Sequence, residues 1–175
     1  MESKLTAERV RELLRYDPCT GIFHWRKSLS NRTPVGSVAG ALSVTSKGMR
    51  YIRIKLDGEK HGAHRLAWLY ITGAWPRAFV DHIDGDGTNN AFGNLREASP
   101  SQNAFNTRPR DSSTSGVAGV TYDQSRGQWR AEITAHGNVK VLGMFDDMAL
   151  AINARRAAEP KHHGPFAFGC RNHPG

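Results

Sequence analysis

The chain has 175 residues and is basic, with 24 Lys and Arg against 16 Asp and Glu and a net charge of +8. No apolar stretch approaches the roughly 20 residues of a membrane-spanning helix, and the N-terminus lacks the apolar segment of a signal peptide. The two cysteines form no C-x-x-C pair, so they indicate neither a disulfide framework nor a zinc ribbon. We therefore expect a cytoplasmic protein that does not enter a membrane. Its positive charge favours a polyanion, nucleic acid first.

The chain begins with a short predicted helix and a short strand. Residues 5–16 carry apolar side chains near one face of a helix, with Thr6 as a suitable N-cap. Residues 21–25 predict a strand, and residues 26–40 are rich in Gly, Ser, Asn and Pro, which predicts a loop.

A clean alternation of apolar and polar side chains follows over residues 51–56 and predicts a half-buried strand. The outward face of this strand would carry Arg53 and Lys55, which are candidates for contact with phosphates. After a hairpin turn, residues 64–71 predict a helix that ends at Gly73.

The most informative motif spans residues 80–104. An Asp81-His82 pair follows a short apolar run, and a polar, Gly-rich loop comes next. Asn94 then opens a second short ordered segment, and a predicted helix after it carries Asn103. The pattern predicts strand, loop, strand and helix, with these four side chains close together.

The residue types of this motif suit the cleavage of a phosphodiester. A neutral imidazole can take a proton from water near pH 7. Carboxylate and amide oxygens are hard ligands that suit Mg²⁺, which keeps its remaining positions for water and phosphate. A second amide can orient the imidazole.

Two simpler interpretations compete with this one. The loop D-G-D-G-T-N-N is also typical of a solvated turn. That explanation leaves Asp81-His82 and Asn103 without a reason. A calcium loop of the EF-hand type fails, because with Gly87 as its glycine the end positions hold His82 and Gly93 in place of Asp and Glu.

The C-terminal part has a different pattern. Polar, Ser-rich residues 104–116 predict a linker, with a domain boundary near Ser112. Three strands and one helix are predicted after it, the helix with an N-cap at Asp146-Asp147 and its end at Pro160. The predicted strands are residues 117–122, 129–134 and 139–145.

The motif resembles the HNH nucleases, in particular the phage and intron-encoded homing endonucleases. The resemblance implies a ββα-metal core in which His82 is the general base and Asn94 orients it. It also implies that Asp81 and Asn103 hold one divalent ion, Mg²⁺ or alternatively Mn²⁺. Arg96 would contact a phosphate of the DNA.

The C-terminal part resembles the AP2 DNA-binding domain. The segments that carry the resemblance are S-G-V-A-G-V, Q-W-R-A-E-I, L-G-M-F, an Ala-rich helix and H-G-P-F-A. The resemblance implies that one face of the sheet meets a DNA groove, with Thr121, Arg130 and Thr134 among the contacting residues.

Together these inferences predict an α+β protein of two parts. Residues 1–111 form an N-terminal region and HNH core, and residues 112–175 form an AP2-like module with a C-terminal tail. We expect a metal-dependent endonuclease of bacteriophage origin that nicks or cuts double-stranded DNA in the manner of a homing enzyme and acts as a monomer. The alternative is a DNA-binding regulator that has a nuclease-like fold but no catalysis.

Overall fold

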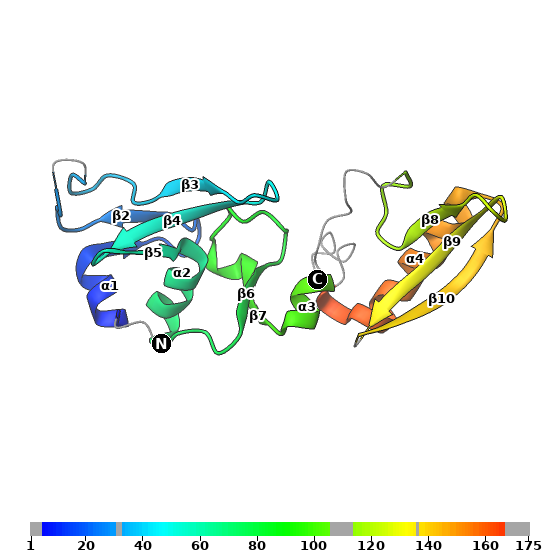
Figure 1. Cartoon of the computed structure of the whole chain (residues 1–175). Helices are drawn as coiled ribbons and strands as arrows, with labels where there is room; N and C mark the ends of the chain where they lie inside the picture. Colours follow the sequence, from blue (N-terminus) through cyan, green and yellow to red (C-terminus); the bar gives the residue numbers. More distant parts are fainter. Residues whose placement is uncertain (1–4, 31–32, 106–113, 136, 167–175) are drawn as a thin grey trace. The chain divides into compact units, whose positions relative to one another are not determined.

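The computed structural model describes residues 5–30, 33–105, 114–135 and 137–166, and of residues 103–105 only the backbone. The chain divides into two compact units, Met1–Ala98 and Ser99–Gly175, each of which mixes helices and strands (Figure 1). The α+β class predicted from the sequence is confirmed. The boundary predicted near Ser112 lies outside the described residues and stays a prediction.

The first unit holds two helices and three small antiparallel sheets within its described residues. The sheets are the hairpin β1–β2, the three-stranded sheet β3–β4–β5 and the hairpin β6–β7 (Figure 1). The helices are α1 (Ala7–Leu13) and α2 (Ala63–Thr72), and the strands are β1 (Leu14–Tyr16), β2 (Phe23–Trp25), β3 (Ala41–Val44), β4 (Arg50–Leu56), β5 (Glu59–Gly62), β6 (Phe79–His82) and β7 (Leu95–Ala98).

Helix α1 begins where the sequence predicts and ends earlier. The Thr6 hydroxyl accepts a hydrogen bond from the backbone N–H of Arg9 at 3.2 Å, which confirms Thr6 as the N-cap. The predicted extension of the helix to Tyr16 is wrong. Leu14 pairs with Trp25 and Tyr16 with Phe23 across β1–β2, so tertiary pairing with the next strand overrides the helical periodicity.

Strand β4 is the central strand of its sheet, and it confirms the strand predicted at residues 51–56. Asp57 and Gly58 both have positive φ, 45° and 90°, which suits the tight turn to β5. Strand β3 was not predicted. Its side chains are mostly exposed, so it lacks the apolar alternation by which a strand is recognised from sequence.

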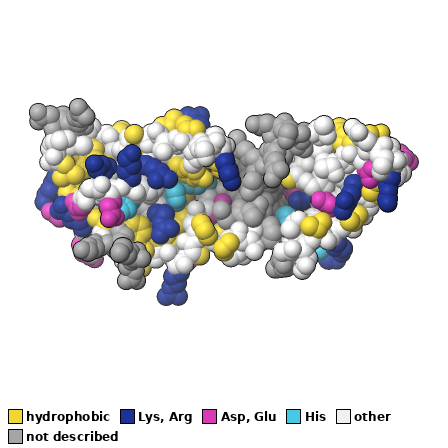
Figure 2. Space-filling view, viewed as in Figure 1, with side chains coloured by type: hydrophobic (Ala, Val, Ile, Leu, Met, Phe, Trp, Pro, Cys, Tyr) yellow, Lys and Arg dark blue, Asp and Glu magenta, His cyan; other side chains and the backbone are white. Residues whose placement is uncertain are grey.

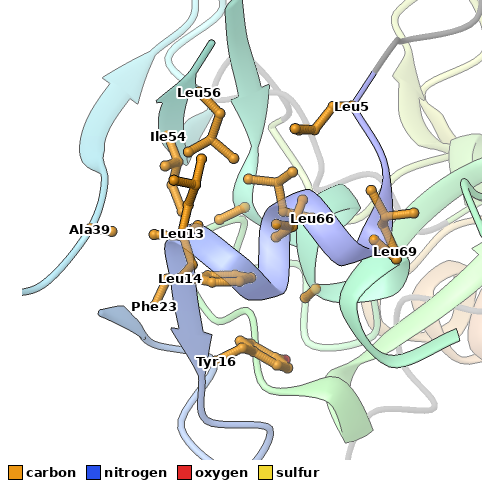
Figure 3. Packing of buried hydrophobic residues seen from close by; sticks show 14 of the residues in the cluster. Leu5, Leu13, Leu14, Tyr16, Phe23, Ala39, Ile54, Leu56, Leu66 and Leu69 are labelled. Atoms are coloured by element: carbon orange, nitrogen blue, oxygen red, sulfur yellow. The ribbon is translucent and has the colours of Figure 1, made fainter. Parts of the chain in front are cut away.

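A single apolar core holds the first unit together (Figure 3). Helices α1 and α2 contribute Leu13 and Leu66, β2 contributes Phe23, and β4 contributes Ile54 and Leu56, all of them almost fully buried. Helix α2 ends at Gly73, which has φ 78° and closes the helix with a left-handed residue, as predicted. The β6–β7 hairpin packs against this core, which holds it in place.

The second unit contains one sheet and one long helix in its described part. The strands β8 (Val120–Asp123), β9 (Gln128–Ala135) and β10 (Asn138–Phe145) form an antiparallel sheet in the order β10-β9-β8. Val120, Ala131 and Ala151 form its buried centre between the sheet and α4 (Met148–His163). The short α3 (Pro100–Phe105) and the 3₁₀ helix η2 (Gly164–Phe166) complete the unit.

Helix α4 continues past Pro160 to His163, so the predicted stop at Pro160 is wrong. A proline inside a helix removes one backbone hydrogen bond and costs about 3 kcal/mol. Two contacts hold this end of the helix, one within α4 and one with β9. Arg155 and Glu159 form a buried ion pair of 2.9 Å one turn earlier, and a ring nitrogen of His163 is 2.8 Å from the carbonyl oxygen of Thr134 in β9. None of the described helices has the length and apolarity needed to cross a membrane.

Candidate active site

The hairpin β6–β7 places Asp81 and His82 at the end of a strand in the first unit. Asp81 pairs with Arg96 and His82 with Leu95 across the hairpin. Both residues are buried, with 6% and 5% of their surface exposed. Burial of a carboxylate and an imidazole is costly unless each has a polar partner, so their contacts decide what they can do.

Asp81 forms an ion pair with Arg96. Both Nε and Nη2 of the guanidinium donate to Oδ2 of Asp81, at 3.0 and 2.8 Å. The Arg96 side chain is only 16% exposed. A carboxylate accepts bonds at two oxygens, so Arg96 and a cation can share Asp81.

Asn94 closes the loop between the two strands. It ends the 3₁₀ helix η1 (Phe92–Asn94), and its side-chain oxygen accepts from the backbone N–H of Asp84 at 3.0 Å. Its side-chain nitrogen donates to Oδ1 of Asp84 and to the carbonyl oxygen of Asn89. Its backbone oxygen accepts from the N–H of Ile83, the residue after His82. Through these hydrogen bonds Asn94 holds the loop that follows His82.

The amide that contacts the imidazole belongs to Asn90. Oδ1 of Asn90 lies 3.2 Å from Nε2 of His82, and Asn90 is 2% exposed. Sequence reasoning did not single out Asn90. The only signal was the N-N pair in the loop, which turn chemistry also explains.

Two aromatic rings pack against His82. Its ring centroid lies 5.1 Å from that of His64 in α2 and 6.2 Å from that of Tyr51 in β4. Burial, together with the charges of His82, Arg65 and Arg53, lowers the pKa of His64 to about 3, so this imidazole is neutral at physiological pH. Its Nδ1 has no hydrogen-bond partner among the described residues.

The hairpin therefore brings together Asp81, His82, Asn94 and Arg96 of the predicted set. Asn103 belongs to the backbone of α3, and its side chain lies outside the described residues. The other predicted contacts are spread over two sheets. Arg53 and Lys55 lie on β4 of the first unit, and Thr121, Arg130 and Thr134 lie on β8 and β9 of the second.

The donor set fits a hard divalent cation in chemical type. Among the described residues no three His, Cys, Asp or Glu side chains gather into a metal-binding group. The set inferred from the sequence, however, is one carboxylate and one amide. Mg²⁺ is commonly bound through one or two carboxylates, with water and substrate phosphate as its other ligands, so a small set of this kind is compatible with it.

Comparison with known proteins finds a nuclease family over the segment that holds this site. Residues 61–105 match the family model described as HNH endonuclease, a range that covers α2, the β6–β7 hairpin and α3. The chain is also 34% identical over 108 residues to protein 3.8 of Escherichia phage T7, an alignment that covers 59% of this chain and 86% of the phage protein.

The chain thus carries an HNH endonuclease domain and belongs to the same family as the T7 protein. No solved structure gives a significant match.

Proposed function

We propose that the protein is a metal-dependent endonuclease that hydrolyses phosphodiester bonds of double-stranded DNA. The observation that carries the proposal is the geometry of His82. Its imidazole is buried, it directly follows Asp81 in β6, and an amide oxygen contacts Nε2, within the segment that matches the HNH model. An imidazole can act as a general base that takes a proton from water. Homing-type nicking and a monomeric state are part of the proposal.

Each residue of the hairpin has a role in this proposal. His82 removes a proton from the attacking water, and Asn94 holds the loop that begins directly after it. Asp81 and Asn103 would hold one divalent ion, Mg²⁺ or Mn²⁺, which supplies charge neutralisation at the departing oxygen. Arg96, bound to Asp81, would contact the phosphate group.

Incubation of the purified full-length chain with supercoiled plasmid tests the activity. With Mg²⁺ we expect open circular DNA, the product of nicking, and no conversion when EDTA removes the ion. A protein that binds the plasmid and leaves it supercoiled with both Mg²⁺ and Mn²⁺ would contradict the proposal. That result would favour the second candidate, a DNA-binding regulator without catalysis.

A basic stripe on the first unit supports DNA as the substrate. Arg53 and Lys55 of β4 alternate with buried Ile54, so they share the face that also carries Tyr51, the ring beside His82. Lys60 of β5 lies directly opposite Lys55 in the sheet. Figure 2 shows Lys and Arg side chains gathered on the face of this unit that β4 crosses.

The pairing of Lys55 with Lys60 is unfavourable for the fold alone. Like charges directly opposite each other in a sheet destabilise it. No acidic side chain forms an ion pair with either lysine in the described part of the chain. We infer that the stripe Arg53, Lys55 and Lys60 binds phosphates of the DNA that enters the site.

Replacing both Lys55 and Lys60 with Ala should weaken DNA binding for all sequences alike. Each lost phosphate contact should flatten the plot of log affinity against log salt by about 0.9, because fewer counterions are released. Binding titrations at several salt concentrations measure this slope. Lys27→Ala is the matched control, since Lys27 already pairs with Glu12 at 2.6 Å. An unchanged slope in the double variant would contradict the phosphate role.

We further propose that the second unit reads the DNA sequence through the outer face of its sheet, as the resemblance to AP2 domains implies. Ala131 and Ile133 of β9 are buried, so the alternate residues Arg130, Glu132 and Thr134 lie on the other face. Thr121 pairs with Arg130 across β8–β9. Arg130 is held by Glu132 at 3.0 Å, which limits its freedom and suits directional contact with base edges.

Arg130→Ala in the full-length chain should change the preference among cleavage sites and leave the cutting chemistry intact. A base contact is worth about 1–3 kcal/mol of discrimination. Sequencing of cleavage products from a randomised DNA library measures the preference. Arg126→Ala removes an exposed arginine from the adjacent turn and should leave the preference unchanged. If the two variants give the same site profile as the wild type, this face of the sheet is not the reader.

A further inference from the structure

Asn90 is the most buried polar residue among the described residues. The hydrogen bonds of its side-chain amide show which end faces His82. The side-chain nitrogen donates to the carbonyl oxygen of Thr88 at 3.0 Å. A carbonyl oxygen can only accept, so the nitrogen of the amide faces Thr88 and the oxygen faces His82. An amide oxygen can likewise only accept, which makes Nε2 of His82 the donor in the 3.2 Å contact.

The backbone of Asn90 is held from two sides. The hydroxyl of Tyr16 donates to its carbonyl oxygen at 2.7 Å. Burial, with the nearby charges of Asp17 and Cys19, raises the pKa of Tyr16, so the phenol remains a donor. Gly21 lies so close that a Cβ there would fall 2.2 Å from the carbonyl carbon of Asn90.

Thr88, whose carbonyl oxygen accepts from the Asn90 amide, is also held in place. Thr88 is held through both its backbone N–H and its hydroxyl, which donate to Oδ1 of Asp86 at 2.9 and 2.7 Å. Thr88 therefore presents its carbonyl oxygen from a loop that has its own internal bonds. The orientation of the Asn90 amide follows from the local fold and does not depend on a ligand.

We propose that Asn90 is a positioning residue that holds the neutral imidazole of His82 in the tautomer with its proton on Nε2. In that tautomer the lone pair of the ring lies on Nδ1. The atom that accepts the proton of the attacking water is then Nδ1, and the proton on Nε2 stays in the bond to Asn90 throughout the step. This consequence for catalysis rests on the proposed nuclease function, whereas the tautomer itself does not.

The tautomer can be measured without any activity assay. Long-range ¹H–¹⁵N correlation spectra of the ¹⁵N-labelled full-length protein distinguish a protonated ring nitrogen from an unprotonated one. The signals of His82 are those that disappear in His82→Gln. With the imidazole neutral, we expect Nε2 protonated and Nδ1 unprotonated in the wild type. A proton on Nδ1 in the wild type would overturn the inference, and this result requires no folded variant at Asn90.

Two substitutions test Asn90 itself. Asn90→Leu keeps the size of the side chain and removes the acceptor, so the His82 signals should shift towards a mixture of both tautomers. Asn90→Asp restores an acceptor and should restore the Nε2–H pattern. Asn89→Ala is the matched control. Asn89 lies in the same loop, and its side-chain nitrogen donates to Oδ2 of Asp84 at 2.7 Å. An unchanged wild-type pattern in a folded Asn90→Leu protein would contradict the role of Asn90.

Cleavage assays then separate this inference from the proposed function. Asn90→Leu should lower kcat by about 10–100-fold with little change in KM, the range seen when a partner that orients a metal-bound histidine is lost. Asn90→Asp should recover most of the loss. A wild-type protein with Nε2 protonated and no cleavage would overturn the nuclease function and leave the positioning role intact. A protein that cleaves DNA and carries the proton on Nδ1 would overturn the positioning role and leave the nuclease function intact.

Discussion

His82→Ala should reduce DNA cleavage to background and leave DNA affinity nearly unchanged. A general base contributes about 10²–10⁴-fold to the rate. It acts on the transition state and contributes little to binding of the ground state. His82 is buried in the hairpin, and the stripe Arg53, Lys55 and Lys60 that we propose to bind phosphates lies on another sheet. Initial rates of plasmid nicking and a binding titration with the same DNA measure the two effects separately.

His82→Gln removes the chemistry with less disturbance to the fold. The Gln amide can still donate a hydrogen bond towards Asn90 and cannot take a proton from water. It should therefore be as inactive as His82→Ala. His61→Ala serves as the control, because His61 is an imidazole of the same unit that packs against Trp75. Near wild-type cutting by His82→Gln, or loss of binding and cutting together in a folded variant, would contradict the assignment.

Asp81→Asn should abolish metal-supported cleavage, and raised Mg²⁺ should not restore it. Asp81 carries the only negative charge of the proposed ligand set, so its loss removes most of the attraction for the ion. We prefer Asn to Ala because removing one partner of a buried ion pair is strongly destabilising, and Arg96 would be left without Asp81. Asn103→Ala, by contrast, should be partly rescued by raised Mg²⁺ or Mn²⁺.

The concentration of metal that gives half-maximal cleavage measures these effects, and binding of Mn²⁺ followed by electron paramagnetic resonance measures affinity without cleavage. Glu97→Gln is the control. It removes a carboxylate from the same hairpin, one that accepts from the backbone N–H of Arg77 and lies one residue beyond Arg96. Unchanged metal affinity in Asp81→Asn and Asn103→Ala would remove both residues from the proposed ligand set.

Much of the candidate site could be predicted from the sequence because its elements are local. The apolar run before Asp81, the loop and the start of β7 follow one another within a few residues, so short-range patterns place Asp81 and His82 at a strand end. The same holds for Thr6 as an N-cap and for the strands of the second unit. The catalytic roles of His82 and Asn94 and the ligand roles of Asp81 and Asn103 stay predictions. So do the DNA contacts of Arg53, Lys55, Arg96, Thr121, Arg130 and Thr134.

The partner of each polar side chain, in contrast, depended on the tertiary structure. Sequence reasoning assigned the orienting amide to Asn94, whereas the described bond to the imidazole comes from Asn90. Asn90 and Asn94 are the same residue type, four positions apart in one loop, so the sequence alone does not tell which of them contacts the imidazole. Packing against Tyr16 and Gly21 holds the backbone of Asn90, and Thr88 orients its amide towards the imidazole.

The sequence by itself determined the fold class, the order of most elements and the residues of the HNH motif, because periodicity, caps and turn residues act over short distances. Only the tertiary structure decided that residues 14–16 leave the helix to pair with β2, that β3 exists, and that α4 continues through Pro160. In each of these cases a contact with another element decides: β1 pairs with β2, β3 pairs with β4, and His163 of α4 contacts Thr134 of β9. These contacts override the local helix preference that a sequence pattern reports, which is at most about 0.7 kcal/mol for an ordinary residue and about 3 kcal/mol for proline.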